Sequence, residues 1–149
     1  MSNGQLKWGI KTSLVNYVEK LEDGKVVVIE PATREAREFI FELDSEASNF
    51  DQTAKTGWLQ FRGGVTLSGH WDSLNVTVID PLIEIENDRA SLGISVGGVI
   101  AEPHNEVIAR GDFNRETGAI ELFLTQVGQN IFGPQYQVGQ QIDSAHLVL

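Results

Sequence analysis

The side chains most suited to binding a metal or an unusual ligand are scarce in this chain of 149 residues. It contains three histidines and two tyrosines: His70, His104, His146, Tyr17 and Tyr136. The single methionine is the first residue and there is no cysteine, which excludes thiolate zinc sites, iron–sulfur clusters, cysteine nucleophiles and an internal methionine ligand. The histidines and tyrosines are therefore the first candidates for chemistry.

The three histidines have different sequence surroundings. His70 lies near the end of an expected strand, beside Gly69, and a glycine there permits close approach of another group. A lone histidine at a strand end is usually structural. His104 follows Pro103 in a polar turn, where we expect it to be solvated. For His146 the sequence does not decide between core and surface.

Familiar enzyme motifs are missing from the sequence. It has no phosphate-binding loop ending in Lys-Ser/Thr, no dinucleotide fingerprint, no His-Glu-x-x-His and no Gly-x-Ser-x-Gly. Glu84 and Glu86 would share one face of a strand, as a pair of carboxylates for acid–base chemistry must. The sequence identifies no desolvating or charged neighbour that would tune either carboxylate, so we expect a solvated face.

Length and composition predict one domain over residues 1–149, long enough for a substantial core. The net charge is −10 and no two basic residues are adjacent, which disfavours nucleic acid as a partner. Apolar runs are far shorter than the roughly 20 residues of a transmembrane helix. The first five residues are polar and lack the layout of a signal peptide, so we expect a cytoplasmic protein, or a secreted or cell-surface one whose export signal is absent from this chain.

The spacing of apolar residues predicts one helix between Trp8 and Leu21. They recur at helical intervals, at Ile10, Leu14, Val18 and Leu21. Asp23-Gly24 supplies the stop signal. Tyr17 would project from the same face as the apolar residues, where an aromatic ring is by default part of the core.

After this helix the sequence predicts short strands separated by Gly, Asn, Asp and Pro. We expect them near Lys25–Glu30, Glu38–Leu43, Thr56–Phe61, Val65–Trp71, Leu74–Ile79, Leu82–Glu86, Ala90–Val96, Val107–Phe113, Ala119–Thr125 and Ala145–Leu149. Two polar segments, Ser45–Lys55 and Gly128–Gln141, are expected to be long surface connections. The predicted fold class is mainly β, an antiparallel β-sandwich or curled barrel with one N-terminal α-helix.

Three ordered blocks of this sequence resemble a known family. The first is Trp-Gly-Ile-Lys-Thr-Ser-Leu-Val-Asn-Tyr-Val at 8–18. The second joins Gly63–His70 to the strands and Asp-Pro turn of 74–85, and the third includes Phe-Gly-Pro-Gln-Tyr at 132–136. Together they resemble the HtaA domain, a haem-binding family of Gram-positive haem uptake, over essentially the whole chain.

The resemblance implies a set of haem-binding residues. In that family a tyrosine of the first block ligates ferric haem, a histidine of the second hydrogen-bonds that tyrosine, and a tyrosine of the third helps to bind haem; the matching positions here are Tyr17, His70 and Tyr136. A phenolate is a hard anionic donor suited to Fe(III), but a free phenol ionises only near a pKa of ~10. A histidine that donates to the phenolate oxygen would help it to ionise.

The resemblance leaves three functions open. The first is reversible binding of ferric haem b for transport, transfer or buffering, with other haem-transfer proteins as partners. The second is a haem-dependent enzyme that acts on a small molecule at the open iron face. The third is a haem-free β domain for protein interaction, in which Tyr17 and His70 merely pack. A dimer is compatible with all three. Four apolar residues are expected either to flank the porphyrin or to belong to the ordinary core: Ile10, Leu14, Trp71 and Phe132.

Overall fold

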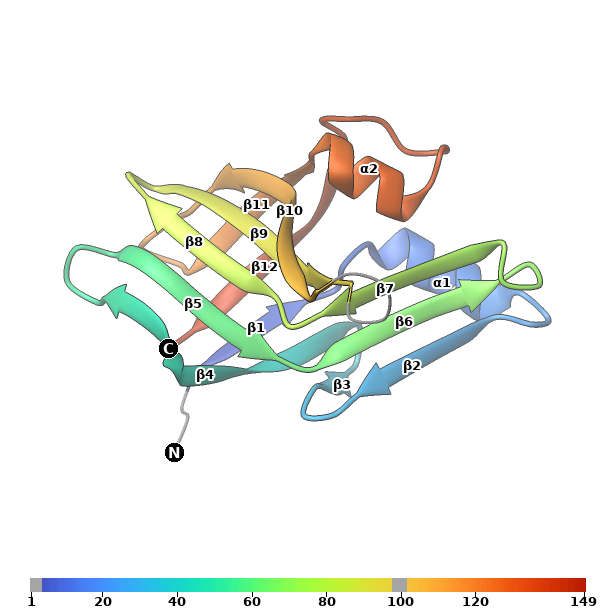
Figure 1. Cartoon of the computed structure of the whole chain (residues 1–149), viewed down its shortest axis with the longest axis horizontal. Helices are drawn as coiled ribbons and strands as arrows, with labels where there is room; N and C mark the ends of the chain where they lie inside the picture. The colour runs from blue at the N-terminus through green and yellow to red at the C-terminus, as the bar shows by residue number, and fades with distance from the viewer. Residues whose placement is uncertain (1–3, 98–101) are drawn as a thin grey trace.

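The computed structural model describes residues 4–97 and 102–149. Those residues form twelve strands and two short helices (Figure 1). In chain order the elements are β1 (Gln5–Trp8), α1 (Thr12–Lys20), β2 (Lys25–Ile29), β3 (Thr33–Glu35), β4 (Glu38–Asp51), β5 (Thr56–Arg62), β6 (Gly64–Gly69), β7 (Leu74–Ile79), β8 (Leu82–Glu86), β9 (Arg89–Val96), β10 (His104–Asp112), β11 (Ala119–Leu124), α2 (Gln126–Phe132) and β12 (Gln141–Val148).

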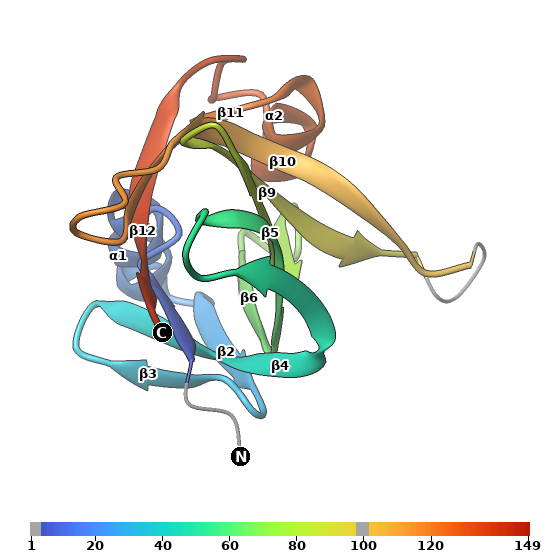
Figure 2. The ribbon, with the colours of Figure 1, turned by 90° about the vertical axis from the view of Figure 1, so that its left-hand side faces the viewer.

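Eight of the strands close into an antiparallel barrel, in the order β1-β12-β11-β10-β9-β8-β5-β4 (Figure 2). The ring closes because β1 pairs on one side with β12 and on the other with β4. Leu6, for example, lies opposite Leu147 on one side and Phe41 on the other. The short strand β3 extends the sheet beside β4. Of the two predicted architectures, the curled barrel is therefore confirmed and the sandwich is not formed.

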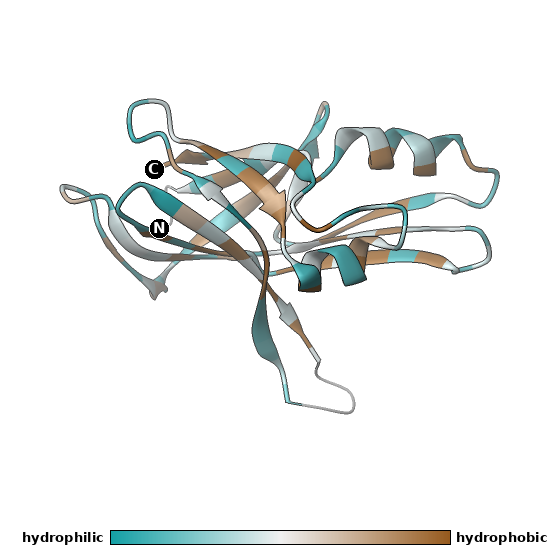
Figure 3. Ribbon diagram, turned by 90° about the horizontal axis from the view of Figure 1, so that it is seen from above, coloured by the Kyte–Doolittle hydropathy of each residue, from teal (hydrophilic) through white to brown (hydrophobic). Residues whose placement is uncertain are grey.

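The barrel interior is filled by the alternating apolar side chains of its strands. In Figure 3 hydrophobic and hydrophilic positions alternate along these strands. The largest side chains with almost no exposed surface include Trp8, Phe39, Phe41, Phe61 and Ile83. These residues belong to one cluster of buried apolar side chains, so this interior is a packed core, as the width of a barrel of eight strands allows. A large ligand must therefore bind outside the barrel.

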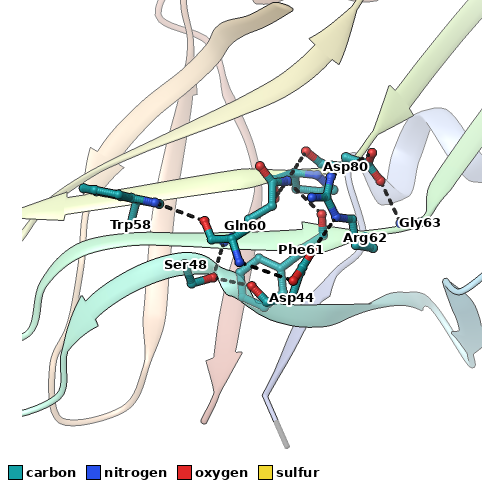
Figure 4. A network of polar contacts seen from close by, with 10 residues as sticks. Asp44, Ser48, Trp58, Gln60, Phe61, Arg62, Gly63 and Asp80 are labelled. Atoms are coloured by element: carbon teal, nitrogen blue, oxygen red, sulfur yellow. Dashed lines mark hydrogen bonds and ion pairs between the residues drawn. The ribbon is translucent and has the colours of Figure 1, made fainter. Parts of the chain in front are cut away.

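A three-stranded antiparallel sheet, β2-β6-β7, extends from the barrel wall. Figure 4 shows the polar network at the junction. The Gly63 amide donates to Oδ1 of Asp80 at 3.0 Å, and the Asp80 amide donates to the Gly63 carbonyl at 2.8 Å. Arg62 bridges Asp80 and Asp44, and its hydrogen bond lowers the pKa of the Asp44 carboxyl. These contacts fix the base of the β6–β7 hairpin, whose far end carries His70.

The first helix is shorter than predicted. Trp8 belongs to β1 rather than to the helix, and Ile10, with a φ of 63°, lies in the connection between them. Asp143 of β12 anchors the helix start, because its carboxylate accepts hydrogen bonds from both the amide and the hydroxyl of Thr12. Its backbone carbonyl also accepts from the Trp8 indole at 2.9 Å. This contact across the chain places α1 over one end of the barrel.

Both predicted surface connections were partly wrong. Strand β4 continues to Asp51 through most of Ser45–Lys55, with an irregular register between Asp44 and Asn49, because an exposed strand needs no apolar side chains. The beginning of Gly128–Gln141 lies in α2, whose N-terminus is capped by the Thr125 hydroxyl, and only the rest is a connection. A hydroxyl cap of this kind stabilises the start of a helix, and the polar composition of Gly128–Gln141 did not indicate α2.

The ten predicted strands are all present, with ends shifted by a few residues at most positions. Strand β6 ends at Gly69 rather than at Trp71. Two strands, β1 and β3, were not predicted, because they have only four and three residues. In the described parts of the chain no helix is long and apolar enough to cross a membrane.

Candidate ligand-binding site

A cleft of about 740 Å³ lies between the two helical regions at one end of the barrel. One wall is formed by α1, the β6–β7 turn and β7, and the other by α2 and the loop that follows it (Figure 1). Its volume falls in the roughly 300–1,000 Å³ range of small-molecule sites. All three residues implied by the family resemblance, Tyr17, His70 and Tyr136, line this cleft.

Tyr17 and His70 form a hydrogen bond although 53 residues separate them in the sequence. The Tyr17 hydroxyl lies 2.6 Å from Nε2 of His70, and the two rings are tilted by 49° with their centroids 5.7 Å apart. Tyr17 is 48% exposed, so it is not a core residue. A neutral imidazole with its proton on Nε2 donates to a phenolate, whereas the other tautomer accepts from a phenol. The contact therefore allows His70 to act either as the donor or as the acceptor of this hydrogen bond.

His70 stands in an unusual turn between β6 and β7. His70, Trp71 and Asp72 follow one another with positive φ angles of 51°, 56° and 68°, a region that side-chain-bearing residues rarely adopt. The Asp23 carboxylate accepts from the backbone amides of His70, at 3.2 Å, and of Trp71, at 2.7 Å. The Trp71 bond is the main reason that the pKa of Asp23 is lowered. The Ser73 hydroxyl donates to the His70 carbonyl at 2.6 Å and closes the turn.

The glycine before this turn has the role predicted from the sequence. A Cβ atom on Gly69 would lie 2.6 Å from Cδ1 of Leu21, which is closer than real Cβ contacts. Gly69 therefore permits the end of the α1 segment to pack directly against the strand that leads into His70.

Tyr136 has a different environment on the opposite wall. It is half-buried and packs edge-on against Phe132, with ring centroids 5.8 Å apart and an interplanar angle of 88°. Burial raises the pKa of the Tyr136 phenol above its ordinary value. Tyr136 is therefore held as a neutral phenol, which can donate a hydrogen bond but is a poor anionic ligand.

The rest of the cleft is apolar or neutral. Its other lining residues are Ser13, Leu14, Ser73, Leu74, Asn75, Val76, Asn130, Ile131, Phe132, Gly133, Pro134 and Gln135. None of them carries a charge, and the aliphatic members lie on both walls. Such a lining favours a large, mainly apolar ligand, with the amide and hydroxyl groups available for its polar edge.

Two of the four apolar residues expected near the ligand line the cleft, and two do not. Leu14 and Phe132 are lining residues. Ile10 has no exposed surface and belongs to the barrel core, which is the ordinary alternative. Trp71 is 89% exposed because the left-handed turn directs it away from the cleft.

The other candidates from the sequence do not join this site. His104 is exposed at the start of β10, with Nε2 3.6 Å from Glu106, and His146 is exposed on β12. Glu84 and Glu86 are exposed on the same face of β8, as predicted. Within residues 4–97 and 102–149 no group of three His, Asp or Glu side chains lies close enough to hold a bare metal ion.

A family model for HtaA (Htaa) matches residues 3–148 of the sequence. The chain belongs to the HtaA family. No curated protein matches the sequence. The crystal structure of the C-terminal domain of HtaA from Corynebacterium glutamicum is similar to it, with 22% identity, a TM-score of 0.81 and coverage of 97% of this chain and 93% of that one.

Two further crystal structures from Corynebacterium glutamicum share the fold. The N-terminal domain of HtaA has 22% identity and a TM-score of 0.78, with coverage of 97% of this chain and 94% of that domain. The haem-binding protein HtaB has 15% identity and a TM-score of 0.69, with coverage of 99% and 96%. The mainly β barrel with short helices is therefore the fold of the HtaA family.

Sequence reasoning missed the contacts of two carboxylates that bind elements of the cleft wall, Asp23 and Asp143. Asp23 was interpreted only as part of a helix stop signal, although its carboxylate holds the His70 turn. Asp143 lies in the third resembling block, but nothing local indicates that it anchors the start of α1. Both contacts join distant parts of the chain, so spacing does not reveal them.

Proposed function

We propose that this chain binds one ferric haem b in the cleft, with the phenolate of Tyr17 as the axial ligand and His70 as its hydrogen-bond donor. The observation that carries the proposal is the 2.6 Å contact between the Tyr17 hydroxyl and Nε2 of His70 at the edge of an uncharged cleft. Membership of the HtaA family and the fold shared with the haem-binding protein HtaB support it.

The side chains present fit such a ligand. Ferric haem supplies a Lewis-acidic iron and a broad apolar ring. Tyr17 offers a hard oxygen donor, and the exposure of its ring gives the phenolic proton a path to solvent. His70, neutral and protonated on Nε2, then donates to the phenolate oxygen and stabilises its charge. Leu14 and Val76 on one wall and Ile131 on the other provide apolar contacts for the ring.

Tyr136 serves as a neutral contact in this proposal. Its phenol is held against Phe132 and its pKa is raised by burial, so it keeps its proton. It therefore donates a hydrogen bond or packs against the ring, whereas Tyr17 binds the iron. The two tyrosines of the chain thus have separate roles.

The proposed role is reversible binding for transport, transfer or buffering, by residues 1–149 acting as one domain. The half-exposed Tyr17 lies at the edge of the cleft, where a competing group, such as one from another haem-transfer protein, would approach the haem. Tyr17 would hold the iron less tightly once its phenolate oxygen is protonated, or once an external reductant has converted the iron to Fe(II), which prefers softer ligands. A haem enzyme receives less support, because among the described residues that line the cleft none is a carboxylate, and the lining imidazole is engaged with Tyr17.

A hemin titration followed by absorption and electron paramagnetic resonance tests this function. We expect one haem per chain and a high-spin ferric spectrum of the tyrosinate type. That spectrum is lost in Tyr17→Phe and altered in His70→Ala, and it persists in the matched Tyr136→Phe variant. Absence of saturable binding, or binding indifferent to Tyr17, would refute the proposal. Turnover of a small molecule by the loaded protein would favour the enzyme instead.

A further inference from the structure

We propose that Asp23 is a positioning residue that holds His70 within hydrogen-bond distance of Tyr17. The inference rests on the proposed function for its importance to haem, but the contact that it concerns belongs to the protein alone. Asp23 does not line the cleft, and it acts through the backbone of the β6–β7 turn.

The turn requires support from outside its own sequence. Left-handed backbone is disfavoured for residues with a Cβ atom, and single residues adopt it far more readily than consecutive ones. Here His70, Trp71 and Asp72 adopt it in succession, and none is a glycine. Such a conformation persists only where the surrounding structure holds it in place. The direction of the His70 side chain therefore depends on the groups that bind the turn.

The Asp23 carboxylate provides this support with both oxygens. Oδ1 accepts from the His70 amide and Oδ2 accepts from the Trp71 amide. A charged acceptor makes a stronger hydrogen bond to an amide than a neutral one. Because the pKa of Asp23 is lowered, the carboxylate is ionised throughout the neutral range. Ser73 adds a bond from within the turn, but it cannot connect the turn to the rest of the protein.

The position of Asp23 in the chain explains why it can set the distance between the two functional side chains. It lies just after α1, the helix that carries Tyr17. Leu21, between them, packs against Gly69 immediately before His70. One short segment therefore places Tyr17 directly and His70 through Asp23. A change at Asp23 should alter the Tyr17–His70 contact while the barrel stays intact.

The chain contains a matched control for this contact. Asp51, at the end of β4, also accepts from two backbone amides in a turn, those of Thr53 at 2.8 Å and Ala54 at 3.0 Å. These bonds also lower the pKa of Asp51. Neither Asp51 nor its turn lines the cleft. Asp51→Asn therefore removes the negative charge from the same kind of interaction, and Asp51→Ala removes the acceptor itself, in both cases without touching the site.

The first test uses nuclear magnetic resonance of the haem-free protein. Tyr17→Phe provides the His70 ring-nitrogen shift in the absence of the hydrogen bond. We expect the His70 shift in Asp23→Asn to move from the native value towards the Tyr17→Phe value, and in Asp23→Ala to move further. Asp51→Asn should keep the native shift. A native shift in both Asp23 variants, or an equal change in Asp51→Asn, would overturn the proposal.

The second test measures haem dissociation. Partners of metal ligands typically contribute about 10–100-fold to affinity, and we expect Asp23→Ala to raise the dissociation rate about tenfold. Asp51→Ala, the matched control, should stay within about twofold of the native rate, as a surface change away from the site does. If the His70 shift moves in Asp23→Ala but the haem dissociation rate stays at the native value, the position of His70 has no effect on haem binding. That result would overturn the proposed importance of Asp23 for haem.

Results that refute the proposed haem function can be distinguished from results that refute the role of Asp23. If Tyr17→Phe binds haem as the native chain does, the proposed ligand is wrong, whereas the resonance shifts of the haem-free protein still decide the role of Asp23. Thermal unfolding of each variant, followed by the circular dichroism of the barrel strands, establishes that the barrel is folded.

Discussion

The two tyrosines of this chain face the same cleft from walls of opposite character. Tyr17 is half-exposed and hydrogen-bonded to His70. Tyr136 is half-buried, packs edge-on against Phe132, and has a pKa raised by desolvation. The comparison shows that one residue type has two different environments in this cleft, and the proposed roles of the two tyrosines follow from that difference.

The two walls are also built differently. The Tyr17 wall depends on polar contacts between distant segments, from Asp143 to the helix start and from Asp23 to the His70 turn. On the other wall, α2 is capped by its own neighbour Thr125, and Tyr136 packs against a residue four positions before it. Substitutions on the first wall should therefore change the chemistry of the site, and those on the second mainly its packing.

The largest expected effect comes from Tyr17→Phe. Removing the hydroxyl removes the proposed anionic ligand while the ring stays, so haem affinity should fall by more than the roughly 10–100-fold typical of outer partners. A competition titration measures the change. An equal loss in Tyr136→Phe would break the comparison, because it would give the two phenols the same role.

His70→Ala should have the next largest effect. In the proposed complex this substitution removes the hydrogen-bond partner of the Tyr17 oxygen, and affinity should fall about 10–100-fold. The absorption spectrum should still show a bound ferric haem at high protein concentration. His146→Ala, at an exposed histidine outside the cleft, is the control and should bind as the native chain does. A His70→Ala protein with native affinity would show that the hydrogen bond does not support the ligand.

Tyr136→Phe sharpens the comparison from the other side. The packing against Phe132 is kept and one hydroxyl is lost, so we expect a loss of affinity below about tenfold, as for a single neutral hydrogen bond. The tyrosinate spectrum should be unchanged. In the haem-free native protein, the Tyr136 ring resonances should titrate above the ordinary value of 10.0, because burial raises its pKa. Titration below that value would contradict the assignment as a neutral contact.

The smallest expected effect is the pH dependence of the thermal stability that Asp23 contributes. The pKa of Asp23 is lowered from 3.8 chiefly by the hydrogen bond from the Trp71 amide. The stability that the ionised carboxylate gives to the folded protein is therefore fully present above pH 3.8, and it is lost as the pH falls through the lower pKa of the folded state. The difference in thermal midpoint between the native chain and Asp23→Asn should therefore be constant near neutrality and shrink below about pH 4. A difference in thermal midpoint that grows on acidification would contradict this prediction.

Much of the fold was predictable from the sequence because it depends on local patterns. Alternation and turn residues indicated ten strands, and the helical spacing from Leu14 to Val18 indicated α1. The start of the helix was misplaced because Leu6 and Trp8 alternate as a strand within a segment that also fits helical spacing. Helix α2 was missed because it has only seven residues, and most of them are polar or glycine, although Val127, Ile131 and Phe132 pack against the core.

For the candidate site, the sequence predicted which residues take part but not how each of them is positioned. The resemblance selected Tyr17, His70 and Tyr136, and the structure brings all three to one cleft. Local spacing suggested that Tyr17 is a core residue, but its place at the edge of the apolar face leaves it half-exposed. Asp23 was not predicted, since its role depends on a hydrogen bond across 47 residues and on the left-handed turn that it supports.

The most direct test of the account is resonance Raman spectroscopy of the ferric haem complex, with excitation into the band that couples an iron-bound phenolate to the metal. We expect tyrosinate vibrations to be enhanced in the native protein and in Tyr136→Phe, and to disappear in Tyr17→Phe. Enhancement that survives in Tyr17→Phe, or disappears in Tyr136→Phe, would contradict the assignment of Tyr17 as the ligand.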